Sequence, residues 1–108
     1  MNQDTKIENA EIGWEDTIVM VCSKCGSQFK DTHSQESPER MKSELKSKAK
    51  SELGKSVRVI TTSCLNICPV DKIAIAVATT KEPAVFKAYA VDPEVSGEEL
   101  YKKIFKAL

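Results

Sequence analysis

Two strand-like runs in this chain each lead directly to a pair of cysteines. Residues 17–21 form a short, nearly continuous apolar run that ends at Cys22, and residues 57–62 form a β-branched run followed by Ser63 and Cys64. A helix between two strands can connect them as parallel neighbours by a right-handed crossover. The carboxyl ends of parallel neighbours lie at one edge of the sheet, where ligands collect in α/β structures. The sequence therefore predicts that the two cysteine pairs meet.

The segment between these runs carries the signals of an amphipathic helix. Ser37 is the predicted N-cap, Pro38 the first helical residue and Gly54 the C-terminal stop. An apolar residue recurs at every fourth position, which is typical of a helix that packs one face on a core: Met41, Leu45, Ala49 and Leu53. The preceding residues 26–37 are predicted to be a polar loop.

The rest of the chain predicts a hairpin and a second helix. Residues 72–78 and 84–91 are alternating or β-branched runs, and residues 79–83 form the turn between them. Ser96 and Glu99 have the spacing of a capping box, which opens a terminal helix. The apolar stripe of that helix is Leu100, Ile104, Phe105 and Leu108.

The resulting element order is β-α-β-β-β-α. It predicts an α/β domain with a four-stranded mixed sheet and two main helices. The apolar run at residues 17–21 favours a central strand buried on both faces. We expect residues 15–108 to form this one domain and residues 1–14 to be a mobile acidic N-terminal tail.

Composition limits the classes of function. The chain has 108 residues, of which 41% are hydrophobic and 30% charged, and its net charge is zero. Such a chain forms one globular domain, and it has no overall field that favours nucleic acid or an anionic membrane as a partner. No secretory signal is recognisable and no apolar run is long enough to cross a bilayer, so we expect a cytoplasmic protein, monomeric or homodimeric, whose thiols are kept reduced.

Four thiols brought together in a reducing compartment indicate metal ligation or redox chemistry. Thiolates favour iron–sulfur clusters, zinc or copper(I), and in a [2Fe–2S] centre a natural arrangement gives each close pair to one iron. The candidate ligands are Cys22, Cys25, Cys64 and Cys68. A structural zinc site with four cysteines is the first alternative, and a thiol–disulfide oxidoreductase that uses Cys22 and Cys25 is the second.

The neighbours of the cysteines suit a shielded thiolate centre. We expect Gly26 to let the backbone turn so that N–H groups point at sulfur. Leu65 and Ile67 are predicted to fold over the site and exclude water, and Lys24 to offset negative charge. His33, the single histidine, is an alternative to Cys25 as the fourth ligand, although a lone loop histidine is more often solvated.

These segments together resemble the thioredoxin-like [2Fe–2S] ferredoxins, a superfamily that includes small predicted metal-binding relatives. The similarity covers about residues 16–108 and rests on residues 18–22, residues 63–68, the hairpin after them, and residues 91–94. It implies a thioredoxin-like fold, a [2Fe–2S] cofactor and one-electron transfer to a redox protein partner. It also implies that Cys22, Cys64 and Cys68 are cluster ligands. The close spacing of Cys22 and Cys25 is more similar to the metal-binding relatives, because the ferredoxins usually separate their first two ligands by a longer loop.

The charged face of the first helix has two interpretations. Its basic residues are Lys42, Lys46, Lys48 and Lys50, among the acidic residues Glu39, Glu44 and Glu52. They either form a docking patch for an acidic redox partner or, as the interspersed acids favour, a solvated face on which Glu44 pairs with Lys48. The sequence contains no set of nucleophile, base and orienting acid. We therefore expect a protein that is not an enzyme, unless it is the thiol–disulfide oxidoreductase described above.

Overall fold

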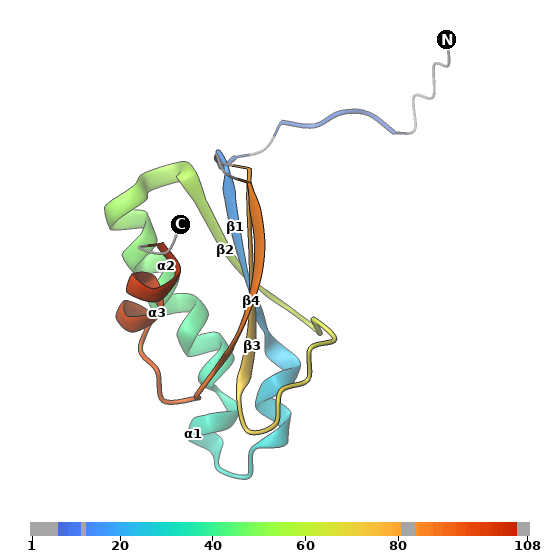
Figure 1. Ribbon diagram of the computed structural model, residues 1–108, viewed down its shortest axis with the longest axis vertical. Helices are drawn as coiled ribbons and strands as arrows, with labels where there is room; N and C mark the ends of the chain where they lie inside the picture. The colour runs from blue at the N-terminus through green and yellow to red at the C-terminus, as the bar shows by residue number, and fades with distance from the viewer. Residues whose placement is uncertain (1–6, 12, 81–83, 106–108) are drawn as a thin grey trace.

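A four-stranded mixed sheet forms the centre of the molecule (Figure 1). Its strands are β1 (Thr17–Cys22), β2 (Val57–Thr62), β3 (Ile73–Thr79) and β4 (Val85–Val91), in the order β2-β1-β3-β4. Strands β1 and β2 are parallel, whereas β3 is antiparallel to both β1 and β4. The computed structural model describes residues 7–11, 13–80 and 84–105.

Two main helices, α2 (Ser37–Leu53) and α3 (Gly97–Phe105), cover the same face of this sheet (Figure 1). Helix α2 connects β1 to β2 as the crossover that parallel pairing requires. The 3-10 helix η1 (Ser23–Gln28), the short helix α1 (Thr32–Gln35) and the 3-10 helix η2 (Gly54–Ser56) complete the structure. The α/β class predicted from the sequence, with a four-stranded mixed sheet and two main helices, is confirmed.

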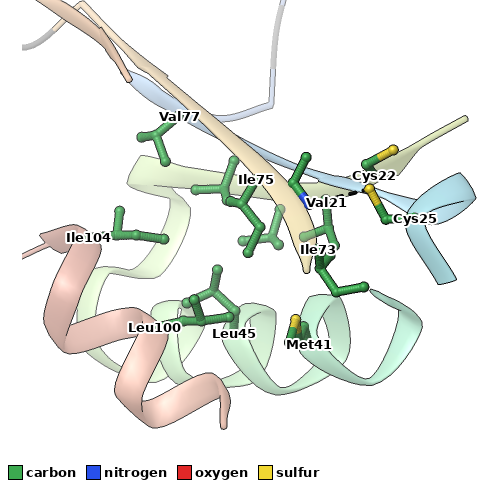
Figure 2. Close-up of a cluster of buried hydrophobic side chains, with 13 residues drawn as sticks. Val21, Cys22, Cys25, Met41, Leu45, Ile73, Ile75, Val77, Leu100 and Ile104 are labelled. Carbon is green, nitrogen blue, oxygen red and sulfur yellow. Dashed lines mark hydrogen bonds between the residues drawn. The ribbon is translucent and has the colours of Figure 1, made fainter. Parts of the chain in front are cut away.

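The core lies between the sheet and the two helices (Figure 2). Because side chains alternate along a strand, every second residue of β1 and β3 points to the helices. The strand residues that do so are Val19, Val21, Ile75 and Val77. They form one core with residues of the predicted apolar stripes of the two helices, namely Met41, Leu45, Leu100 and Ile104. All of them are buried, so the period-four pattern of α2 and the pattern of α3 identify the helix faces correctly. Leu108 lies outside the described residues.

Neither of the two main helices packs on the opposite face of the sheet (Figure 1). Ile18 and Met20 of β1 are only half-buried there, and the Phe86 side chain of β4 is 72% exposed. The expectation that residues 17–21 are buried on both faces is therefore wrong, because both helices pack on the same side.

Helix α2 begins one residue earlier than its N-cap signal indicates. Its N-cap is Glu36, which makes no side-chain capping bond, and Ser37 lies within the helix. The Ser37 hydroxyl is buried and donates to the carbonyl oxygen of His33 at 3.3 Å, which makes it unavailable as a cap. The predicted C-terminal stop at Gly54 is confirmed, with φ at 60°.

The expected ion pair between Glu44 and Lys48 is wrong. Glu44 instead accepts from Arg40 at 2.9 Å, and Lys48 lies 3.9 Å from Glu52. Arg40 is held in place because its Nη2 atom also donates to the carbonyl oxygens of Pro93 and Val95. A tertiary anchor for the guanidinium therefore decides which residue Glu44 pairs with.

Residues 26–37 are not a simple loop, because η1 and α1 occupy much of this stretch. The Asp31 carboxylate caps α1 by accepting from the backbone N–H of Ser34 at 2.8 Å. This bond lowers the pKa of Asp31. An Asp followed by small polar residues was the available signal for this short helix.

Parts of other predictions fall outside the described residues. They include residues 1–6 and 12 of the proposed N-terminal tail and residues 81–83 of the hairpin turn. Within the described ranges, no helix is long and apolar enough to span a membrane.

The capping box of α3 is confirmed and predicts a measurable stability contribution. Ser96 Oγ accepts from the N–H of Glu99 at 3.2 Å, and Glu99 Oε1 accepts from the N–H of Ser96 at 3.3 Å. We expect Ser96→Ala to lower the free energy of unfolding by about 1 kcal/mol, measured by denaturant titration. Ser47→Ala, at an exposed site within α2, is the control and should change the free energy by less than about 0.5 kcal/mol. Equal effects of the two changes would contradict the role of the cap.

Candidate metal centre

All four cysteines line one cavity of about 240 Å³. Cys22 is the last residue of β1 and Cys25 lies in η1, while Cys64 and Cys68 lie in the loop after β2. All four are free thiols. The parallel pairing of β1 with β2 therefore brings together two pairs that are distant in the sequence, at the edge where both strands end.

The two pairs differ in burial. Cys22 is 3% exposed and Cys25 is 8% exposed, and both belong to the hydrophobic core (Figure 2). Cys64 and Cys68 are exposed. The cavity therefore joins the end of the core to the surface, with one pair on its inner side and one toward solvent.

Backbone N–H groups point at three of the sulfurs. The N–H of Ala74 in β3 lies 3.4 Å from Cys25 Sγ (Figure 2), and the N–H of Asn66 lies 3.3 Å from Cys64 Sγ. Such donors stabilise the thiolate form and tune the potential of thiolate-bound clusters. These two donors come from β3 and from the loop after β2, and backbone groups of Lys24, Cys25 and Leu65 bond to the Cys22 sulfur.

Close packing explains why residue 26 is a glycine. A Cβ atom at this position would overlap the carbonyl oxygen of Gln35 and lie 3.3 Å from Cδ of Pro38. Only a residue without a side chain lets η1 pack this tightly on α1 and the start of α2. Gly26 thereby sets the position of the helix that carries Cys25.

The loop that carries the outer pair turns tightly. Asn66, Cys68 and Asp71 have φ values of 58°, 50° and 59°, in the left-handed region. Asn and Asp adopt this conformation more readily than other residues with side chains, but Cys does not share this preference. The backbone at Cys68 is therefore held by the loop around it.

Gln28 connects the two cysteine-bearing segments. Its Nε2 atom donates to the carbonyl oxygens of Cys25 at 3.0 Å and Lys72 at 2.8 Å, and its Oε1 atom accepts from the N–H of Asp71 at 2.8 Å. The side chain thus joins η1 to the loop that follows Cys68. Sequence reasoning missed this residue, because a single glutamine in a polar stretch carries no local signal.

We expect Gln28→Ala to lower the free energy of unfolding by about 1 to 2 kcal/mol, because it removes three hydrogen bonds. It should also speed the reaction of Cys68 with a thiol reagent, since the loop loses its tie to η1. Gln35→Ala is the matched control: Gln35 donates to the backbone of Phe29 outside the cavity. Equal thiol reactivity in both variants would contradict the connecting role of Gln28.

The inner thiols differ in acidity. Burial raises the pKa of Cys22, but hydrogen bonds from the Leu65 backbone, the Cys25 thiol and the Cys25 and Lys24 backbone outweigh it, so this pKa is lowered. Burial raises the pKa of Cys25, and the neighbouring Cys22 and Cys68 raise it further against the opposing bond from Ala74. Within the inner pair, Cys22 is therefore the more readily ionised thiol.

The other residues expected at the site are only partly present there. Lys24 lines the cavity, and it is the single charged side chain among the described residues that do so. Leu65 and Ile67 do not line the cavity; Leu65 packs on the core, and Pro69 and Val70 form that part of the wall. The Val70 side chain is 81% exposed, and no sequence pattern distinguished it from its neighbours.

His33 does not lie at the cavity. It is exposed on α1, and the part of the chain around the cavity contributes no imidazole or carboxylate to the lining. Of the two candidates for a fourth ligand, Cys25 is the one that the fold brings to the other three cysteines.

The donor set consists of four thiols, which suits a thiolate-bound centre. In the described ranges, no three His, Cys, Asp or Glu side chains are arranged as ligands of one metal ion. A zinc site needs four sulfurs at about 2.3 Å from one point. A [2Fe–2S] core presents two irons, each of which takes one pair of thiolates, so the pairs need not converge on one point.

Comparisons with family models, with curated proteins and with solved structures find no match to this chain.

Proposed function

We propose that the protein binds one [2Fe–2S] cluster and carries single electrons to a redox protein partner. The ligands in this proposal are Cys22, Cys25, Cys64 and Cys68. The observation that carries it is that these four thiols, from three different segments, line one cavity in which no other metal-ligating side chain is present among the described residues. The resemblance to thioredoxin-like [2Fe–2S] ferredoxins supports the same assignment.

The surroundings suit electron transfer. The exposed outer pair would put the cluster near the surface, where a partner can approach it. The Ala74 and Asn66 N–H groups would lower the basicity of their sulfurs, and Lys24 would offset the negative charge of the bound cluster. Free cysteines suit the reducing cytoplasm, which is the location that we propose.

Purification without oxygen, followed by visible absorption and metal analysis, tests this proposal. We expect a red-brown protein that holds iron and acid-labile sulfide in equal amounts and bleaches when dithionite reduces it. A colourless protein with one zinc per chain would contradict electron transfer and would favour the zinc-binding interaction module instead. Chemical reconstitution with iron and sulfide covers the case in which expression yields the metal-free chain.

A thiol–disulfide oxidoreductase is the second candidate, and one observation favours it. Cys22 is the N-cap residue of η1, Cys25 lies within that helix, and the Cys25 side chain is one of the groups that lower the pKa of Cys22. In this reaction Cys22 attacks a partner disulfide, forms a mixed disulfide and releases one partner thiolate. Cys25 then attacks Cys22, so that the protein becomes oxidised and the partner leaves as a dithiol.

Redox titration of metal-free protein distinguishes the two candidates. The oxidoreductase predicts a reversible disulfide between Cys22 and Cys25 and a stable mixed disulfide in Cys25→Ser. The electron carrier predicts that reconstituted protein protects all four thiols from alkylation, and that Cys22 and Cys25 do not reduce a model disulfide catalytically.

A further inference from the structure

A second hollow, of about 630 Å³, lies at the other end of the parallel strand pair from the cysteines. It is formed by the second half of α2, by η2, by the start of β2 and by the segment before β1. Four basic side chains and one aromatic ring line it: Lys46, Lys50, Lys55, Arg58 and Trp14. Gly13, Gly54, Val57 and Val59 complete the lining, and no acidic side chain of the described residues takes part.

Among the described residues, the four cations of this hollow differ from other lysines of α2 in their ion pairing. Lys42 pairs with Glu39 at 2.9 Å, and Lys48 lies near Glu52 and over the Tyr101 ring. No ion pair in the described ranges involves the four cations of the hollow. The solvated-face interpretation therefore fits Lys42 and Lys48, whereas Lys46 and Lys50 belong to a different surface.

The negative end of the α2 dipole explains only part of this cluster. Lys50 lies in the last turn of α2, where a cation is favourable without any ligand. Lys55 and Arg58 lie beyond the helix end, in η2 and β2. Four like charges around one hollow repel one another, so their arrangement is most favourable when an anion neutralises them.

We propose that this hollow binds a small phosphorylated ligand of the nucleotide class, with its phosphates on the four cations and its base against Trp14. The volume is in the range of small-molecule sites, and a lysine and arginine cluster is suited to phosphate oxygens. The indole ring of a tryptophan can stack against a nucleotide base, because every base has a π-face. The proposal does not depend on what the cysteines bind.

The protein carries its own reporter for this site, since Trp14 is its single tryptophan. Titration with ATP, without divalent metal, should change Trp14 emission saturably, and calorimetry of the same titration gives the affinity independently. Raising the salt concentration should weaken binding, because phosphate contacts are screened. Adenosine alone and pyrophosphate alone should each bind at least about tenfold more weakly, since each makes only one half of the contacts.

Paired variants test which side chains bind the ligand. Lys50→Glu combined with Arg58→Glu should weaken ATP binding by about tenfold or more, because two attractive contacts become repulsive. Lys87→Glu combined with Lys103→Glu changes the net charge equally at exposed sites outside the hollow and should leave the affinity within about twofold. Trp14→Ala should weaken ATP by about tenfold and leave pyrophosphate unchanged in calorimetry.

Three results would overturn this proposal. The first is the absence of saturable ATP binding at low salt. The second is pyrophosphate binding as tight as ATP binding, which would leave no role for Trp14. The third is an equal loss of affinity in the two charge-reversal pairs, which would show attraction by the overall charge and no defined site.

Discussion

Replacing Cys25 with serine should remove the bound iron and sulfide almost completely from reconstituted protein. Serine keeps an acceptor for the Ala74 N–H, which lies 3.4 Å from Cys25 Sγ, but its hydroxyl stays protonated at neutral pH and is a poor ligand for iron. The measurement is visible absorption together with iron and sulfide content after reconstitution without oxygen. Cys25 is the most informative of the four positions, because the cluster, zinc and dithiol interpretations differ most there.

His33→Ala is the matched control, because it removes the alternative ligand without changing the cavity. His33 is exposed and does not line the site, so this variant should keep its full iron and sulfide content. Denaturant unfolding of the metal-free chains should show that Cys25→Ser folds, with a loss of at most about 2 kcal/mol. Retention of the cluster in Cys25→Ser and its loss in His33→Ala would contradict the ligand assignment.

The sheet and both main helices could be predicted because local patterns agree with the global fold. Strand β2 has the predicted bounds, and the apolar period of α2 identifies Met41, Leu45 and Ala49 as buried. The order of the elements also predicts the juxtaposition of the cysteine pairs, since parallel strands end at one edge. These features follow from periodicity and topology alone.

Features set by tertiary contacts could not be predicted in the same way. The pairing of Glu44 depends on Arg40, which is anchored by carbonyl groups more than fifty residues away in the chain. The role of Gln28 depends on a loop that meets η1 only in the folded protein. The basic hollow likewise combines helix, strand and N-terminal residues, so the lysine spacing on α2 shows only half of it.

Gly26→Ala should lower the free energy of unfolding by about 3 kcal/mol, which is a large effect for one methyl group. The added Cβ would overlap the backbone carbonyl oxygen of Gln35, and backbone cannot move aside as a flexible side chain can. Helix η1 must then shift away from α1, and Cys25 shifts with it. We therefore expect cluster content to fall together with stability, as measured by denaturant titration and by visible absorption after reconstitution.

Gly13→Ala provides the matched control, because a Cβ at Gly13 would meet no atom within 4 Å. The two variants make the same chemical change and reduce the freedom of the unfolded chain equally, so their difference isolates the packing of η1. Gly13→Ala should alter the free energy of unfolding by less than about 0.5 kcal/mol and leave the cluster content unchanged. If Gly26→Ala lost stability but kept a full cluster, the position of η1 would not control ligation by Cys25. If it lost neither, the close packing of η1 on α1 would itself be contradicted.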